Sequence, residues 1–150
     1  MMKKLNFQLP PIEREATKKA VEAALEKYRM LLLTESLDKQ PNITSNYTIE
    51  PPSTTNKISS STENTAIENV DFQIERQDYI RKFIHAVNKL NSIERKIIIK
   101  RYMEEDTFDY EVYNQLHLSE SKYYRIKARA FYKLALALRI EVYEEGAVSV

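Results

Sequence analysis

Glycine content is the feature that most constrains this chain, because its 150 residues include only one glycine, Gly146. Tight two-residue hairpin turns and phosphate-binding loops favour glycine, which adopts positive φ angles and admits a close ligand without a steric penalty. The sequence contains no Gly-x-Gly-x-x-Gly pattern and no P-loop. The sequence therefore predicts an all-α protein without a nucleotide cradle.

Cysteine is absent, which excludes disulfide bonds and thiolate metal sites. The first residues, "MMKKLNFQLPPIERE", contain two lysines but no apolar run of the secretory type. The apolar clusters "MLLL" and "LALAL" are far shorter than the roughly 20 residues that span a bilayer. We therefore expect a soluble, intracellular protein that is not associated with a membrane.

The N-terminal part divides into a helical pattern and a polar segment. Small and apolar side chains recur at three- and four-residue spacing over residues 12–33, behind two prolines, so residues 1–35 are expected to form one amphipathic helix. Serine, threonine, asparagine and proline then dominate residues 36–66, which are predicted to be a disordered or extended linker. Whether the helix packs in cis or on a second chain is left open.

The C-terminal part, residues 67–150, is predicted to be a four-helix domain. The apolar spacing places its helices at about 71–90, 92–103, 109–116 and 119–142. Asn91 followed by Glu94 has the spacing of a capping box at the start of the second of these helices. The apolar run "LALAL" near the end of the fourth helix needs cover, either from the 71–90 helix or from a second copy.

The last two predicted helices have the order of a helix-turn-helix, with a short helix, a tight turn and a longer basic helix. Ser119 is placed to cap the second helix, and Tyr123 and Ile126 are expected to face inward. His117 occupies the turn position where glycine is common, and histidine is among the residues that tolerate positive φ. Tyr113 replaces the small residue expected there, which indicates a wider helix spacing.

The outward side chains of the basic helix are those expected of a DNA-reading surface, because the start of the second helix of such a motif enters the major groove. A merely solvated charged face is the alternative interpretation. The candidates for base readout are Ser121, Lys122, Tyr124 and Arg125. The candidates for phosphate contact are Arg95, Lys96, Ser119, Lys127, Arg129 and Lys133.

Two longer stretches, "LNSIERKIIIKRY" and "FDYEVYNQLHLSESKYYRIKARAFYKLALAL", resemble region four of bacterial sigma factors. The order of "ATKKAVEAALEKYRMLL", "NITSNYT", "ENTAIENVDFQIERQDYIRKF" and "LHLSESKYYRIKARAFYKLA" is similar to that of the ArpU-type phage transcriptional regulators, over most of the chain. This resemblance implies a sigma-region-four-like helix-turn-helix domain. It also implies activation of late or lysis-related phage genes.

The expected partner is double-stranded DNA, with host RNA polymerase as a further partner and a homodimer as an alternative to a monomer. A different interpretation is a small-terminase-like subunit that recognises DNA for phage packaging. No catalytic constellation is apparent, so neither an enzyme nor a cofactor is predicted. Two separated histidines make no zinc site, and the acidic residues Glu104, Glu105, Asp106 and Asp109 are expected to form a solvated loop.

Overall fold

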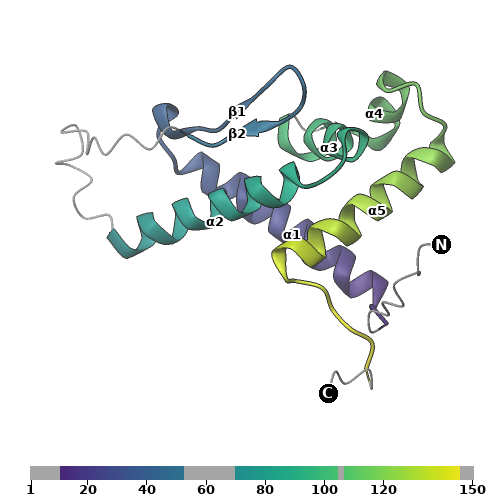
Figure 1. Cartoon of the computed structure of the whole chain (residues 1–150), viewed down its shortest axis with the longest axis horizontal. Helices are drawn as coiled ribbons and strands as arrows, with labels where there is room; N and C mark the ends of the chain where they lie inside the picture. Colours follow the sequence, from purple (N-terminus) through teal and green to yellow (C-terminus); the bar gives the residue numbers. More distant parts are fainter. Residues whose placement is uncertain (1–10, 53–69, 105–106, 146–150) are drawn as a thin grey trace, which may run out of the picture.

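The computed structural model describes residues 11–52, 70–104 and 107–145, and these ranges contain five α-helices and one small β-hairpin (Figure 1). The α-helices are α1 (Arg14–Leu33), α2 (Val70–Asn88), α3 (Ser92–Ile98), α4 (Asp109–Gln115) and α5 (Glu120–Leu138). The shorter elements are the 3₁₀-helix η1 (Leu37–Lys39), the strands β1 (Asn42–Ile43) and β2 (Ile49–Glu50), and the π-helical segment η3 (Ile99–Glu104). The predicted all-α class is confirmed. No helix of the described ranges is long and apolar enough to cross a membrane.

Helix α1 belongs to the same core as the C-terminal helices. Glu13 caps it by accepting hydrogen bonds from the backbone N–H groups of Glu15 and Ala16. Its buried face contacts α2 and α5, and the ring of Tyr28 stacks on Phe83 of α2 at a centroid distance of 4.4 Å. Figure 1 shows α1 crossing both helices. The helix therefore packs in cis. We had expected α1 to be separate from the C-terminal helical domain, but the two share one core.

The polar segment after α1 also folds, as far as the structure describes it. Strands β1 and β2 pair antiparallel, with Ile43 opposite Ile49. Tyr47 adopts φ 55° in the connecting turn, where the chain has no glycine. The expectation of a disordered or extended linker is therefore wrong for residues 36–52, while residues 53–66 lie outside the described residues.

Two polar side chains attach this hairpin to the helices. Asn88 at the end of α2 accepts a hydrogen bond from the backbone N–H of Ile49 at 3.0 Å and donates one to its carbonyl at 2.9 Å, as a neighbouring strand would. Ile49 is only 2% exposed and lies in the core. Arg95 donates to the carbonyl of Tyr47 at 3.0 Å. The burial of Ile49 and these hydrogen bonds stabilise the hairpin, although the polar composition of the segment favours disorder.

The buried apolar side chains form two clusters, and α3 lies between them. Ile98 and Ile99 belong to the larger cluster with α1, α2, β2 and α5, whereas Ile97 belongs to a smaller one under α4 and the start of α5. Consecutive side chains of a helix point about 100° apart. Three successive residues that are each 0% exposed therefore require contacts on several sides of the helix.

Two of the predicted C-terminal helices, 92–103 and 119–142, differ from the structure at their C-terminal ends. The helix expected over 92–103 is continuous but widens into the π-helical segment η3, where Thr107 donates its hydroxyl hydrogen to the carbonyl of Lys100 at 2.9 Å. Helix α5 ends at Leu138 instead of near 142, because Arg139 adopts the left-handed conformation with φ 58°. Leu134 and Ala135 of the "LALAL" run are buried in the larger cluster with α2 side chains, so the chain itself covers much of that run.

Candidate nucleic-acid interface

Helices α4 and α5 are joined by a tight turn at residues 116–119, which has the predicted backbone conformation. His117 adopts φ 56°, and the backbone N–H of Leu118 reaches back to the carbonyl of Tyr113 at 2.9 Å. Ser119 then caps α5, its hydroxyl oxygen accepting from the backbone N–H of Lys122 at 3.2 Å. These bonds satisfy backbone groups at the end of α4 and the start of α5, which fixes the direction in which α5 leaves the turn.

A small core of its own supports this turn. Val112, Tyr123 and Ile126 are buried together with Ile97 of α3, which confirms the predicted inward orientation of Tyr123 and Ile126. The ring of Tyr113 packs at an angle against that of Tyr123, with centroids 5.6 Å apart. A tyrosine therefore fits where a small residue was expected, because its ring lies in this core.

The first turns of α5 present the four residues that were expected to read bases. Ser121, Lys122, Tyr124 and Arg125 are all exposed. Residues three and four positions apart are neighbours on a helix, so Ser121 lies beside Tyr124 and Arg125, with Lys122 at the flank. Among the described residues, neither Lys122 nor Arg125 has an ion-pair partner. Lys122 and Arg125 can therefore offer hydrogen-bond donors and positive charge without first breaking an ion pair with a described residue.

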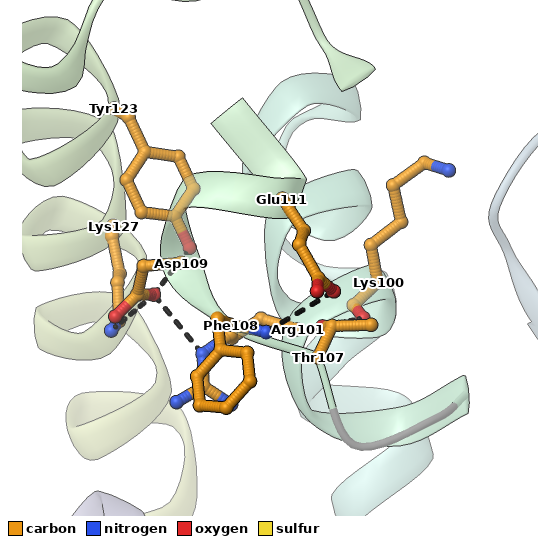
Figure 2. Close-up of polar contacts among 8 residues, drawn as sticks. All are labelled: Lys100, Arg101, Thr107, Phe108, Asp109, Glu111, Tyr123 and Lys127. Atoms are coloured by element: carbon orange, nitrogen blue, oxygen red, sulfur yellow. Dashed lines mark hydrogen bonds and ion pairs between the residues drawn. The ribbon is translucent and has the colours of Figure 1, made fainter. Parts of the chain in front are cut away.

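The middle of α5 is different, beginning with Lys127. Figure 2 shows Arg101 of η3 and both Tyr123 and Lys127 of α5 converging on Asp109, the first residue of α4. One carboxylate oxygen of Asp109 accepts from Arg101 at 3.1 Å, from the Tyr123 hydroxyl at 2.6 Å and from Lys127 at 3.0 Å. We call these four residues the Asp109 cluster. It joins η3, α4 and α5 at one point.

The protonation equilibria of this cluster favour the charged carboxylate. Burial by itself would raise the pKa of Asp109, but the hydrogen bonds from Tyr123 and Lys127 and the charges of Lys127 and Arg101 outweigh it, so the pKa lies below its ordinary value. Burial, and then the hydrogen bond to Asp109, raise the pKa of the Tyr123 hydroxyl, which therefore remains a donor. The cluster is thus fully formed at neutral pH.

A second carboxylate, Glu94 of α3, binds two further basic residues of α5, Arg129 and Lys133. Arg129 donates to it at 2.9 Å and Lys133 at 3.0 Å, while the Glu94 side chain is 0% exposed. Glu94 also completes the predicted capping box with Asn91, which is confirmed. Burial by itself would raise the pKa of Glu94, but the Asn91 N–H and the two cations outweigh that effect and lower it. We call Glu94, Arg129 and Lys133 the Glu94 cluster.

The two candidate phosphate contacts on α3 have different surroundings. Arg95 points to the hairpin and to the end of α2, where it donates to the carbonyls of Tyr47 at 3.0 Å and Leu90 at 2.6 Å. Lys96 is half-buried and has no ion-pair partner among the described residues. Arg95 therefore has a structural role beside the role expected for it.

Asp109 and Glu94 have roles that the sequence indicated only in part. Asp109 was expected to belong to a solvated acidic loop. This expectation is wrong for Asp109, because its carboxylate is the acceptor of the Asp109 cluster. Glu105 and Asp106 of the same expected loop lie outside the described residues. No local signal marks Asp109, because its partners come from two other elements, η3 and α5. For Glu94 a signal existed: Arg129 and Lys133 are four residues apart and so lie on one face of a helix.

Comparison with known proteins places this all-α chain among phage proteins. It is 38% identical over 136 residues to an uncharacterized phage-related protein, Lin1259/Lin1739, of Listeria innocua, covering 91% of this chain and 96% of that protein. It is 33% identical over 139 residues to protein Gp66 of Listeria phage A118, with the same shares covered. The chain belongs to the family of these phage-related proteins. No family model matches the chain. No solved structure matches it.

Proposed function

We propose that this protein binds double-stranded DNA sequence-specifically through α4 and α5, used as a helix-turn-helix, and thereby regulates transcription of phage genes. The observation that carries the proposal is the exposed surface formed by Ser121, Lys122, Tyr124 and Arg125 on the first turns of α5, whose two cations have no ion-pair partner among the described residues. These turns directly follow the capped turn, the position from which such motifs contact base edges. Arginine and lysine there donate to guanine, and tyrosine can contact a thymine methyl group or the backbone.

The charge distribution along α5 supports a division of roles. Lys127, Arg129 and Lys133 each have a carboxylate partner, which reduces the charge that they offer to phosphates. We therefore assign the main DNA contacts to the start of α5. The hydroxyl hydrogen of Ser119 and the half-buried Lys96 are secondary phosphate contacts in this proposal.

The biological setting of the proposal comes from the relatives and from the resemblance described above. The relatives are phage proteins, and their names say nothing about DNA. The likeness to ArpU-type regulators supports activation of late or lysis-related genes in the bacterial host cytoplasm, with host RNA polymerase as a further partner. We propose no catalytic role.

The experiment is a selection of bound duplexes from a randomised pool, followed by titration of the selected and a scrambled duplex at several salt concentrations. We expect a selected sequence to bind about 10³-fold or more tightly than the scrambled one. The double variant Lys122→Ala/Arg125→Ala should lose this preference. A matched control, Arg81→Ala/Lys89→Ala, removes an exposed arginine of α2 and the exposed lysine directly after that helix and should retain it. Equal loss in both variants, or no binding of any duplex, would contradict the proposal.

Particle mass distinguishes the packaging alternative from the regulator. A small-terminase-like subunit should assemble into a large closed ring, whereas we expect a monomer or a homodimer. Light scattering of the purified full chain gives this result directly.

A further inference from the structure

A groove of about 670 Å³ separates the first turns of α1 from the outward face of α5. Arg14 and Lys18 line it from α1, and Tyr124, Ala128 and Tyr132 line it from α5. Tyr124 also belongs to the surface proposed to read bases. The groove is therefore continuous with that surface.

The two walls of the groove are fixed relative to each other. The segment that follows α5 returns along the start of α1, where Val142 accepts a hydrogen bond from the backbone N–H of Glu13 at 2.8 Å. The backbone N–H of Val142 donates to the hydroxyl of Thr17 at 3.0 Å, and that of Glu144 to the carbonyl of Pro11 at 2.9 Å. The start of α1 is thus held beside α5 before any ligand arrives, so little ordering is needed on binding.

The charge at the α1 wall is available to a ligand. Arg14 and Lys18 are exposed, lie one helical turn apart, and have no ion-pair partner among the described residues. Lys127 and Arg129 also line the groove but are paired in the two clusters. The acidic side chain on the α1 wall of this groove is Glu15, which is exposed.

Further along α1 the basic side chains are interleaved with acidic ones. An adjoining groove of about 660 Å³ further along the helix is lined from α1 by two acids, Glu22 and Glu26, as well as by Lys18, Lys19 and Arg29. A polyanion that contacts α1 is therefore attracted most at its first turns, where Arg14 and Lys18 line the groove with one acid, Glu15.

From this geometry we infer that α1 is a second DNA-contacting element, in which Arg14 and Lys18 bind phosphates of the strand that borders the groove occupied by α5. The inference rests on the proposed function. An α-helix with its side chains is about 10–12 Å wide and the major groove is about 12 Å wide, so an element beside the inserted helix lies over a phosphate backbone. Arg14 and Lys18 occupy that position, next to Tyr124 and Ala128.

The test compares Arg14→Ala/Lys18→Ala with the control Arg81→Ala/Lys89→Ala in the full chain, titrated with a labelled duplex of random sequence. Loss of two phosphate contacts should weaken binding about 10-fold or more at roughly 0.1 M salt and make the plot of log affinity against log salt shallower by about two. The control should match the unmodified protein. Glu15→Gln should change affinity in the opposite direction, because it removes a negative charge from the same rim. Thermal melts should be the same for all variants, since every altered side chain is exposed.

The outcomes separate the two proposals. If Arg14→Ala/Lys18→Ala binds as the control does while Lys122→Ala/Arg125→Ala loses binding, α5 contacts DNA and α1 does not, and the groove would have to serve another partner. If the unmodified protein binds no duplex, both the proposed function and this inference are wrong.

Discussion

The first turns of α5 and its middle carry basic side chains at similar density, but their surroundings differ. Lys122 and Arg125 are exposed and have no carboxylate partner among the described residues. Lys127 lies in the Asp109 cluster, and Arg129 and Lys133 lie in the Glu94 cluster. The comparison teaches that a run of basic residues on one helix can contain two sets of charges. One set is available to a ligand, and the other holds the helix in place.

The strongest test of this difference is to remove the cations of the Glu94 cluster. Arg129→Ala/Lys133→Ala leaves a carboxylate that is 0% exposed without its partners. We expect the free energy of unfolding to fall by about 3 kcal/mol, the lower end for a broken buried pair, because water reaches both cations. Urea denaturation measures this change. A loss below roughly 0.5 kcal/mol would show that these cations belong to the available set.

A smaller effect is expected at the Asp109 cluster. Asp109→Asn retains an oxygen that can accept from Tyr123 but loses the charge that attracts Arg101 and Lys127. We expect a loss of about 2 kcal/mol, as for hydrogen bonds to a charged group that is partly open to solvent. The matched control is Asp78→Asn, which removes an exposed carboxylate of α2 paired with Lys82 and should cost at most about 0.5 kcal/mol. Equal losses in the two variants would contradict a structural role for the Asp109 cluster.

The pH dependence of stability follows from the same two carboxylates. The pKa of each is lower in the folded protein than the ordinary values of 3.8 for Asp109 and 4.5 for Glu94. Their contribution is therefore complete above those values and is lost as the pH falls below them and through the lower native pKa values. Urea titrations from about pH 7 to about pH 3 should show the decline only at the acidic end. The decline should be shallower in Asp109→Asn, and an equally steep decline in that variant would exclude Asp109 as a source.

The smallest expected effect on stability is at the start of α5. Lys122→Ala/Arg125→Ala removes two exposed side chains that have no ion-pair partner in the described part of the chain, so the free energy of unfolding should change by no more than about 0.5 kcal/mol. Denaturation of this variant beside Arg129→Ala/Lys133→Ala compares the two sets of cations directly. A loss of similar size in both variants would remove the distinction between them.

Local features of the fold could be predicted from the sequence, and they are mostly features of neighbouring residues. The capping box of Asn91 and Glu94, the cap at Ser119, the positive φ of His117 and the inward orientation of Ile126 are all present. Each depends on side chains within about one helical turn, where spacing determines geometry. The fold class was indicated by composition, because tight hairpins and phosphate-binding loops favour glycine and the chain has only one.

Features that depend on distant residues could not be predicted. The segment at 36–52 is polar, and its order depends on Asn88 and Arg95, which lie about 40 residues further along the chain. Asp109 appeared to be one acid among several in a loop, although its partners come from η3 and α5. Helical periodicity indicated which side chains of the candidate interface are exposed. Only the structure showed that Arg129 pairs with Glu94, whereas Arg125 has no ion-pair partner among the described residues.

The central claim is that Arg125 reads DNA and Arg129 supports the fold, and one set of measurements on both alanine variants tests it. Each variant is titrated with the selected and the scrambled duplex and is melted under the same conditions. Arg125→Ala should lower affinity for the selected duplex by about 1–3 kcal/mol, relax the preference at one base position and leave the melt unchanged. Arg129→Ala should melt at a lower temperature and keep the ratio of the two affinities. The reverse pattern, with lost preference in Arg129→Ala and lost stability in Arg125→Ala, would contradict the claim.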